Sequence, residues 1–334
     1  MSKRIALKID GVVLLDKPVG ITSQTAVTVV KRSFNAQKAG HTGTLDPLAT
    51  GLLPVCLGEA TKYSQDLLNA DKTYIATILF GAKTDSGDAE GKIISRGQVS
   101  FNADDSAMTE AALGAILPQF SGEILQVPPM HSALKRDGKP LYEYARAGEV
   151  FELEPRRVTI HSLRWISIAW PLATLEVSCS KGTYIRSLAN DMGDVLGCGA
   201  HLTALRRTRV GHLDLANACT IEAVRESKVT LLPVDALVQT LPSFVLDEDL
   251  SNRLALGQRI PVNLPEGGEQ CLRIYRTSVS SENFMGTVDL KEGVLHPRRL
   301  ISQNQSLHLA ESEPAPTSPL MNTLASTTSS INLI

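Results

Sequence analysis

Segments with strand-like composition and segments with helix-like composition are mixed along the first 210 residues, without a regular strand–helix–strand repeat. Residues 11–16 and 73–81 are apolar and rich in β-branched side chains, whereas Thr22 and Ser23 can cap a helix that ends near Asn35. A regular alternation would favour a doubly wound parallel sheet. Its absence predicts an α+β fold with a largely antiparallel mixed sheet flanked by helices.

Further elements follow from apolar periodicity and from Gly and Pro punctuation. They are a strand at 51–58, a helix at 59–69, a helix at 109–117 that stops at Pro118, paired strands at 158–170 and 172–180, a helix at 184–196 that ends at Gly197, and a short helix at 221–227.

The character of the chain changes after residue 240. Residues 243–303 contain short elements separated by Gly and Pro turns, which is typical of a small mostly-β domain. Residues 311–334 contain no Lys or Arg and are rich in Ser and Thr, so we expect a disordered tail. The predicted division is therefore 1–240, 241–310 and 311–334.

The net charge of −2 conceals charged blocks. Residues 1–65 and 131–210 each carry a net +4, whereas 66–130 and 211–334 each carry −5. The two basic blocks could fold into one positive face for a phosphate backbone, or they could simply be solvated.

A basic, turn-rich insertion spans residues 126–157, which we call the arm. A Pro pair and four further Pro and Gly positions punctuate it, and it holds six Lys and Arg side chains: Lys135, Arg136, Lys139, Arg146, Arg156 and Arg157. This composition fits a mobile arm that meets an anionic partner, and it equally fits a long surface loop.

Several classes of protein are disfavoured. No apolar run approaches the roughly 20 residues of a membrane-spanning helix, and the N-terminus lacks an apolar signal core. Five cysteines without a CxxC pair are typical of reduced thiols in a cytoplasmic protein. Cys198 and His201 could offer two metal ligands, but no metal-binding spacing is present, so we expect no metal site.

The segment GHTGTLDPLATG at residues 40–51 has the densest set of unusual residues. Its glycines permit tight backbone turns or the close approach of a ligand, and Pro47 restrains the backbone of Asp46. Such a loop could hold a nucleophile or base steady, with His41 nearby. The alternative is an ordinary Asp-Pro turn in which Asp46 bonds backbone amides.

Three further positions attract attention. Arg186 could pair with a buried carboxylate through its planar fork, or it could be a surface helix residue. Tyr74 at the start of a strand could stack on a base or could belong to the core. Residues 85–91 fail the calcium-loop pattern, and we interpret them as a solvated turn.

Together these segments resemble the TruB family of tRNA pseudouridine synthases. The matching stretches, in the order of the family, are GVVLLDKP at 11–18, residues 40–51, GEATK at 58–62, SALK at 132–135, LYEYA at 141–145, CSKGTYIR at 179–186, GCGAH at 197–201 and LRR at 205–207. Residues 284–289 and 297–300 resemble the family's small RNA-binding (PUA-like) C-terminal domain.

The resemblance implies a pseudouridine-synthase-type catalytic domain and an isomerase (intramolecular transferase) that converts uridine 55 in the T loop of tRNA to pseudouridine. The N1–C1′ bond breaks, the uracil turns, and C5 joins C1′, after the base has been flipped out of the loop at a cost of roughly a few kcal/mol. It implies no metal or other cofactor, tRNA as the partner through its T arm, no membrane or obligate protein partner, and a monomer.

The resemblance also assigns roles to residues. Asp46 would be the catalytic aspartate, by direct attack on the sugar or by a glycal route, and Arg186 would pair with it and keep it ionised. Tyr74 would stack on the flipped base and take part in the last proton step. Tyr184 and Leu205 would line the uracil pocket, His41 would contact the RNA, and the arm would clamp it.

Two other classes of function stay open from the residues alone. One is a noncatalytic protein that binds or folds tRNA with the same surface, and it predicts no product. The other is a hydrolase that uses Asp46 on a small substrate. The second predicts activity without RNA and leaves the basic arm idle.

Overall fold

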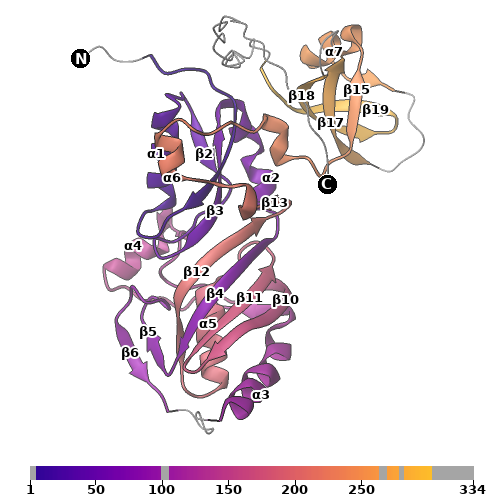
Figure 1. Ribbon diagram of the computed structural model, residues 1–334. Helices are drawn as coiled ribbons and strands as arrows, with labels where there is room; N and C mark the ends of the chain where they lie inside the picture. The colour runs from indigo at the N-terminus through magenta and orange to yellow at the C-terminus, as the bar shows by residue number, and fades with distance from the viewer. Residues whose placement is uncertain (1–4, 99–104, 263–268, 278–281, 303–334) are drawn as a thin grey trace, which may run out of the picture. The chain divides into compact units, whose positions relative to one another are not determined.

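The computed structural model describes residues 5–98, 105–262, 269–277 and 282–302. Its largest feature is a ten-stranded sheet, which in Figure 1 runs from β2, beside α1, down to β10 and β11. In order across the sheet its strands are β14 (Cys219–Thr220), β1 (Gly11–Lys17), β3 (Thr50–Leu57), β12 (Ala200–Val210), β4 (Lys72–Phe80), β11 (Leu172–Cys179), β10 (Arg156–Ala169) and β7 (Gly122–Gln126), with β2 (Ala39–His41) beside β3 and β13 (Leu213–Asp214) beside β12.

The sheet is mixed but mostly antiparallel. Among the described strands, β1 pairs in parallel with β14 and β3 pairs in parallel with β12, and the remaining pairs of this sheet are antiparallel. The α+β fold with a largely antiparallel mixed sheet is therefore confirmed. The parallel contact between β3 and β12 is short and lies in the middle of the sheet.

Helices and short hairpins fill the connections between the strands. The helices are α1 (Ser23–Ser33), α2 (Ser64–Leu68), α3 (Ser106–Ile116), α4 (Leu141–Arg146), α5 (Ile185–Val195), α6 (Ile221–Arg225) and α7 (Glu248–Ala255), and the 3-10 turns are η1 (Gly58–Tyr63), η2 (Leu117–Phe120), η3 (Leu215–Asn217) and η4 (Val234–Leu237). The hairpins are β5 (Ala82–Thr84) with β6 (Ile93–Arg96), and β8 (Lys135–Arg136) with β9 (Lys139–Pro140).

The helix predicted over residues 59–69 is instead a 3-10 turn, η1, followed by one short α-helix, α2. The side-chain hydroxyl of Thr61 donates to the carbonyl of Gly58 at 2.7 Å, and that of Ser64 donates to the carbonyl of Thr61 at 2.9 Å. Such local bonds compete with the regular helical pattern, which explains the tighter turn.

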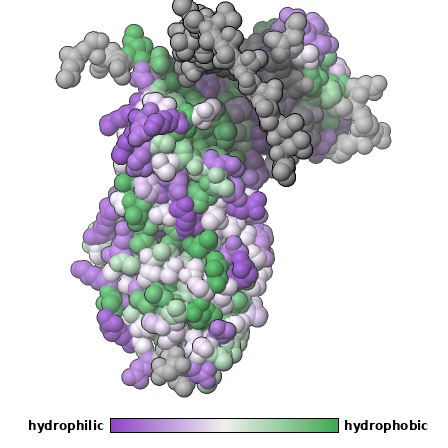
Figure 2. Space-filling view, in the orientation of Figure 1, coloured by the Kyte–Doolittle hydropathy of each residue, from purple (hydrophilic) through white to green (hydrophobic). Residues whose placement is uncertain are grey.

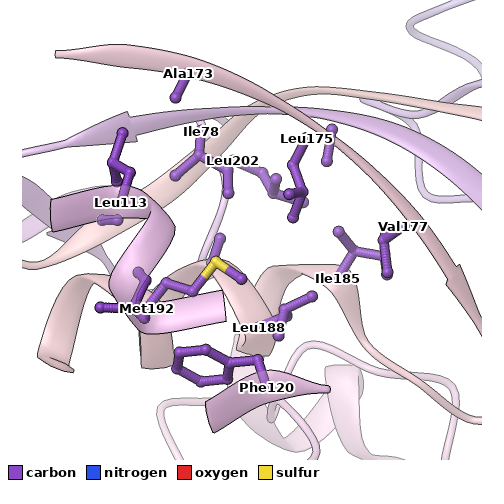
Figure 3. Packing of buried hydrophobic residues seen from close by; sticks show 14 of the residues in the cluster. Ile78, Leu113, Phe120, Ala173, Leu175, Val177, Ile185, Leu188, Met192 and Leu202 are labelled. Atoms are coloured by element: carbon purple, nitrogen blue, oxygen red, sulfur yellow. The ribbon is translucent and has the colours of Figure 1, made fainter. Parts of the chain in front are cut away.

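Two apolar clusters support the large sheet. The first packs α3 and α5 against β4, β11 and β12 through fully buried side chains such as Leu113, Leu188 and Leu202, and Figure 3 shows it from close by. The second packs α1 and α6 against β1 and β3. Tyr74 and Leu205 are partly buried and contact both clusters, so they mark the junction between the two halves of the sheet.

A separate five-stranded sheet follows in the chain. Its order is β15 (Ser243–Leu246), β17 (Gln270–Thr277), β18 (Glu282–Lys291), β19 (Val294–Leu300) and β16 (Ile260–Pro261), and α7 packs on it through Leu254. The β-rich C-terminal part is thus confirmed. The predicted disordered tail, 311–334, lies outside the described residues.

Hydrophilic residues cover much of the face shown in Figure 2, and hydrophobic residues lie among them in smaller groups. Within the ranges that the structure describes, no helix is long and apolar enough to cross a membrane.

Candidate active site

Asp46 lies on the loop between β2 and β3, and hydrogen bonds from outside this loop fix it. The hydroxyl of Ser23 accepts from the backbone N–H of Leu45 at 2.8 Å and donates to its carbonyl at 3.0 Å. The backbone N–H of Gly20 donates to the carbonyl of Pro47 at 2.8 Å. The loop is therefore held on both sides of Asp46, and its stiffness does not come from Pro47 alone.

Arg207, on β12, also holds the loop that contains Asp46 in place. Its side chain is 1% exposed, and its guanidinium donates to the carbonyls of Leu52 at 2.8 Å and Gly43 at 3.1 Å. A buried guanidinium satisfied by carbonyls is a strong clamp because its donors have a fixed geometry. Sequence reasoning gave Arg207 no role, so this contact was missed.

The expected pairing between Asp46 and Arg186 is present. Nη2 of Arg186 lies 3.0 Å from Oδ2 of Asp46, and the two side chains are 6% and 41% exposed. Arg186 sits in the first turn of α5, directly after the N-cap residue Tyr184 and Ile185. The alternative of a surface helix residue is wrong, because the guanidinium is buried.

Three further groups hold the guanidinium of Arg186. It donates to the carbonyl of Ser86 at 2.8 Å and to that of His131 at 2.6 Å, and it lies 3.7 Å from Oδ2 of Asp88, whose side chain is 5% exposed. Arg186 thus joins the Asp46 loop, the turn at 85–91 and the arm.

The interpretation of residues 85–91 as a solvated turn is wrong for Gly87 and Asp88, which are buried. Asp88 accepts from the hydroxyl of Ser86 at 2.5 Å and from the backbone N–H of Glu90 at 3.1 Å. These bonds explain how a carboxylate is buried beside Arg186. A polar run with two glycines gives no sequence signal that separates this burial from solvation.

Burial raises the pKa of the Asp46 carboxyl, and the neighbouring Arg186 opposes that shift without cancelling it. The nearby Asp88 raises the pKa further, whereas Lys17 lowers it. Arg186 favours the ionised carboxylate of Asp46, which is the direction expected from the sequence, but desolvation of the carboxylate is the larger effect.

Lys17 is a second residue that sequence reasoning left without a role. Its side chain is fully buried, and its Nζ donates to the carbonyls of Pro18 and Ile21, both at 2.8 Å. Burial lowers its pKa to about 8, against the opposing effect of Asp46. Lys17 therefore places positive charge near the loop that contains Asp46. Its hydrogen bonds also hold the turn that contains Pro18 and Ile21.

Tyr74 and Leu205 lie on the adjacent strands β4 and β12, where Tyr74 is opposite Arg207 and Leu205 is opposite Ala76. Burial raises the pKa of the Tyr74 hydroxyl, and Arg207 opposes the shift. Tyr74 is therefore a neutral phenol at ordinary pH, suited to stacking and to hydrogen-bond donation rather than to acting as a strong base.

The two other predicted residues flank these strands. His41 ends β2, and its Nδ1 accepts from the backbone N–H of Gly43 at 3.1 Å, which leaves the ring proton on Nε2. Burial, and then Arg207, lower the pKa of His41, so the ring is neutral. Tyr184 is the N-cap of α5, and burial raises the pKa of its hydroxyl.

The structure thus gathers Asp46 and Arg186 in direct contact, and it connects Tyr74 to them through Arg207 and the Asp46 loop. A partly exposed carboxylate beside a buried cation can act as a nucleophile or base on a group that reaches it from outside. Within the described ranges, no group of three or more His, Cys, Asp or Glu side chains is placed to hold a metal ion.

Family profiles match most of the chain in three consecutive segments. Residues 31–185 match "TruB family pseudouridylate synthase (N terminal domain)", and residues 186–239 match "tRNA pseudouridylate synthase B C-terminal domain". Residues 242–301 match "Pseudouridine synthase II TruB, C-terminal".

The names of curated relatives agree with these matches, and one solved structure is similar to this chain. A tRNA pseudouridine synthase B of Burkholderia mallei (strain NCTC 10247) is 52% identical over 305 residues, covering 88% of this chain and 97% of the relative. One of Ralstonia pickettii (strain 12J) is 51% identical over 307 residues, covering 88% and 94%. The structure titled "Crystal Structure of a Cbf5-Nop10-Gar1 Complex" is similar with a TM-score of 0.59 and 26% identity, over 84% of this chain and 78% of that one.

Proposed function

The chain belongs to the TruB family of pseudouridylate synthases, and we propose that it isomerises uridine 55 in the T loop of tRNA to pseudouridine. The observation that carries the proposal is the contact between Asp46 and Arg186. The loop that contains Asp46 is held in place by buried side chains such as Arg207. The names of its relatives as tRNA pseudouridine synthase B support tRNA as the substrate class.

In the proposed reaction, Asp46 acts at C1′ of a uridine that has been flipped out of the RNA. Its carboxylate is 41% exposed, so it can reach a substrate, while Arg186 keeps it oriented from the buried side. The N1–C1′ bond breaks, the uracil turns, C5 bonds to C1′, the hydrogen at C5 leaves as a proton, and N1 gains a proton. Direct attack and a glycal route both use the same carboxylate.

Tyr74 is proposed to stack on the flipped uracil, with Leu205 and Tyr184 completing the pocket. Tyr74 and Leu205 lie at the junction of the two apolar clusters, beside the buried Arg207 that holds the Asp46 loop. A neutral phenol can donate a hydrogen bond to the base while it stacks. His41, with its proton on Nε2, is proposed to donate to the RNA.

The arm is proposed to clamp the tRNA, and its cations are suited to that role. The guanidinium of Arg136 lies 4.3 Å from the ring centre of Phe151, and Nζ of Lys139 lies 4.4 Å from that of Tyr144. Cations that rest on aromatic faces are preorganised and keep hydrogen-bond donors for phosphates.

We retain 1–240 and 241–310 as the catalytic and PUA-like domains of this proposal.

The test is pseudouridine mapping by carbodiimide treatment and primer extension on unmodified tRNA, incubated with the purified protein alone. The expected result is one new stop at uridine 55. RNA binding should weaken steeply with salt, through counterion release from the phosphates. Binding without product would favour the noncatalytic alternative, and turnover of a small substrate without RNA would favour the hydrolase.

A further inference from the structure

The root of the arm is joined to α5 by a buried carboxamide. Gln126 is the last residue of β7 and is 2% exposed. The backbone N–H of Tyr184 donates to its Oε1 at 2.7 Å, and its Nε2 donates to the carbonyl of Tyr184 at 3.0 Å. Gln126 therefore forms hydrogen bonds with both backbone groups of Tyr184, the N-cap residue of α5.

Two further contacts follow along the same turn of helix. The hydroxyl of Ser187 donates to the carbonyl of Val127 at 2.9 Å, and Arg186 donates to the carbonyl of His131 at 2.6 Å. The first turn of α5 and the beginning of the arm thus share bonds at several successive positions, and the guanidinium beside Asp46 is one of them.

The helix α5 has no side-chain cap of its own. Tyr184 has no side chain that accepts from the first turn, and its carbonyl also accepts the first helical bond, from Leu188, at 3.1 Å. Gln126 supplies the missing order from another element. A change in the direction of this turn would move Arg186, which lies two residues further on.

The arm side of the junction is also connected. The carbonyl of Ser132 accepts from the backbone N–H of Tyr142 at 3.0 Å, and that of Leu134 accepts from Leu141 at 2.7 Å. These bonds tie the segment that Arg186 holds to the start of α4. A displacement of the arm is therefore passed through backbone groups to the catalytic arginine.

We propose that Gln126 is a positioning residue that fixes the first turn of α5 against the arm, so that the Asp46–Arg186 pair has its productive geometry when the arm holds RNA. The inference rests on the proposed function, because it concerns the rate of that reaction. Gln126 has no contact with the substrate in this account and acts through Tyr184 and Arg186.

The choice of side chain makes the inference testable. Gln126→Met keeps the length of the side chain but removes both hydrogen bonds to Tyr184. Gln126→Glu keeps the acceptor for the N–H of Tyr184, and because burial at this site favours the protonated acid, its O–H can still donate to the carbonyl of Tyr184. A merely space-filling residue would tolerate the first change better, whereas a positioning residue would tolerate the second change better.

The experiment compares wild type, Gln126→Met, Gln126→Glu and Ser187→Ala in single-turnover pseudouridine formation, tRNA affinity and melting temperature. Thr109→Val is the control, since it removes one buried hydroxyl that donates to the carbonyl of Asp105 at 3.0 Å in α3. We expect Gln126→Met to be about tenfold to a hundredfold slower with unchanged affinity, because small misplacements of reacting groups are costly. Gln126→Glu should lose less, and Thr109→Val should keep the wild-type rate.

Each outcome decides the inference. A wild-type rate in Gln126→Met, or equal losses of rate and affinity, would overturn it while leaving the proposed function intact. If Gln126→Met does not fold, Ser187→Ala must show a slower rate at unchanged affinity, and a wild-type rate there would overturn the inference. If wild type itself forms no pseudouridine, the proposed function fails and this inference fails with it.

Discussion

Arg186 lies between two carboxylates that differ in exposure. The side chain of Asp88 is 5% exposed and that of Asp46 is 41% exposed. The buried carboxylate and two carbonyl groups give the guanidinium a permanent position, and the exposed carboxylate is then free to meet a substrate. At the scale of single residues, the site therefore separates a buried structural aspartate from the exposed one that is proposed to react.

Asp46→Asn should fold at least as stably as wild type at pH 7. Burial raises the folded-state pKa of Asp46, so the folded state holds this proton to a higher pH than the unfolded chain does. Stability is therefore lost as the pH rises from the ordinary pKa through the raised one, and the loss persists at neutral pH. Urea denaturation of both proteins at pH 7 checks this, and a clearly less stable Asn variant would contradict it.

Arg186→Lys should slow turnover about a hundredfold while tRNA affinity stays the same, because one ammonium cannot match the forked contacts of a guanidinium. Lysine is chosen over alanine since removal of the cation would leave Asp88 buried without its partner, at a cost of roughly 3–5 kcal/mol. Single-turnover rates and filter binding measure the two quantities. An unchanged rate would remove Arg186 from the chemistry.

At this scale, the residues marked Asp46 and Arg186 as candidates, the family resemblance assigned their pairing, and neither predicted their surroundings. The loop composition singles out Asp46, because Pro47 and three glycines lie around it. The burial of Asp88 and Lys17 could not be predicted, because it depends on strands that come from distant parts of the chain. Local composition carries no information about which polar run is covered by another element.

Among the elements, the contact between β3 and β12 places the Asp46 loop. Gly51 has a φ of +99°, and a Cβ atom there would lie 2.3 Å from the carbonyl oxygen of Arg207. The glycine is thus needed for the approach of two strands, whereas the sequence left open whether the glycines of this loop serve turns or a ligand.

Gly51→Ala should lower the free energy of unfolding by at least roughly 1–3 kcal/mol, from backbone strain alone, and should lower activity by moving the loop. Gly114→Ala is the matched control, because a Cβ atom in that helical position meets nothing within 4 Å. The control should be more stable by about 0.5–1 kcal/mol. Chemical denaturation of both variants measures these shifts, and equal stability of the two would refute the argument.

Most elements could be predicted from local patterns, since capping residues and apolar periodicity act over a few positions. Thr22 caps α1 as expected, and α3 begins earlier than predicted because Asp105 caps it, accepting from two backbone N–H groups. The strand pairing across β3, β12 and β4 could not be predicted, because it joins segments more than 100 residues apart.

At the scale of the whole molecule, membership of the family indicates the class of reaction. The described residues include the groups that are proposed to perform it. The tail at 311–334 is outside that description, and it contains no Lys or Arg. It therefore has no cation for the phosphate backbone. Deletion of 311–334 should leave the rate of pseudouridine formation and the tRNA affinity within about twofold of the full chain; a large loss of either would show that the tail takes part.

The most direct measurement of the central claim uses tRNA labelled with tritium at C5 of uridine 55, since formation of the C5–C1′ bond releases that hydrogen. Under single-turnover conditions, wild type should release the label to water, and Asp46→Asn should bind the same tRNA with equal affinity and release none. Release by Asp46→Asn at the wild-type rate would contradict the claim that this carboxylate performs the isomerisation.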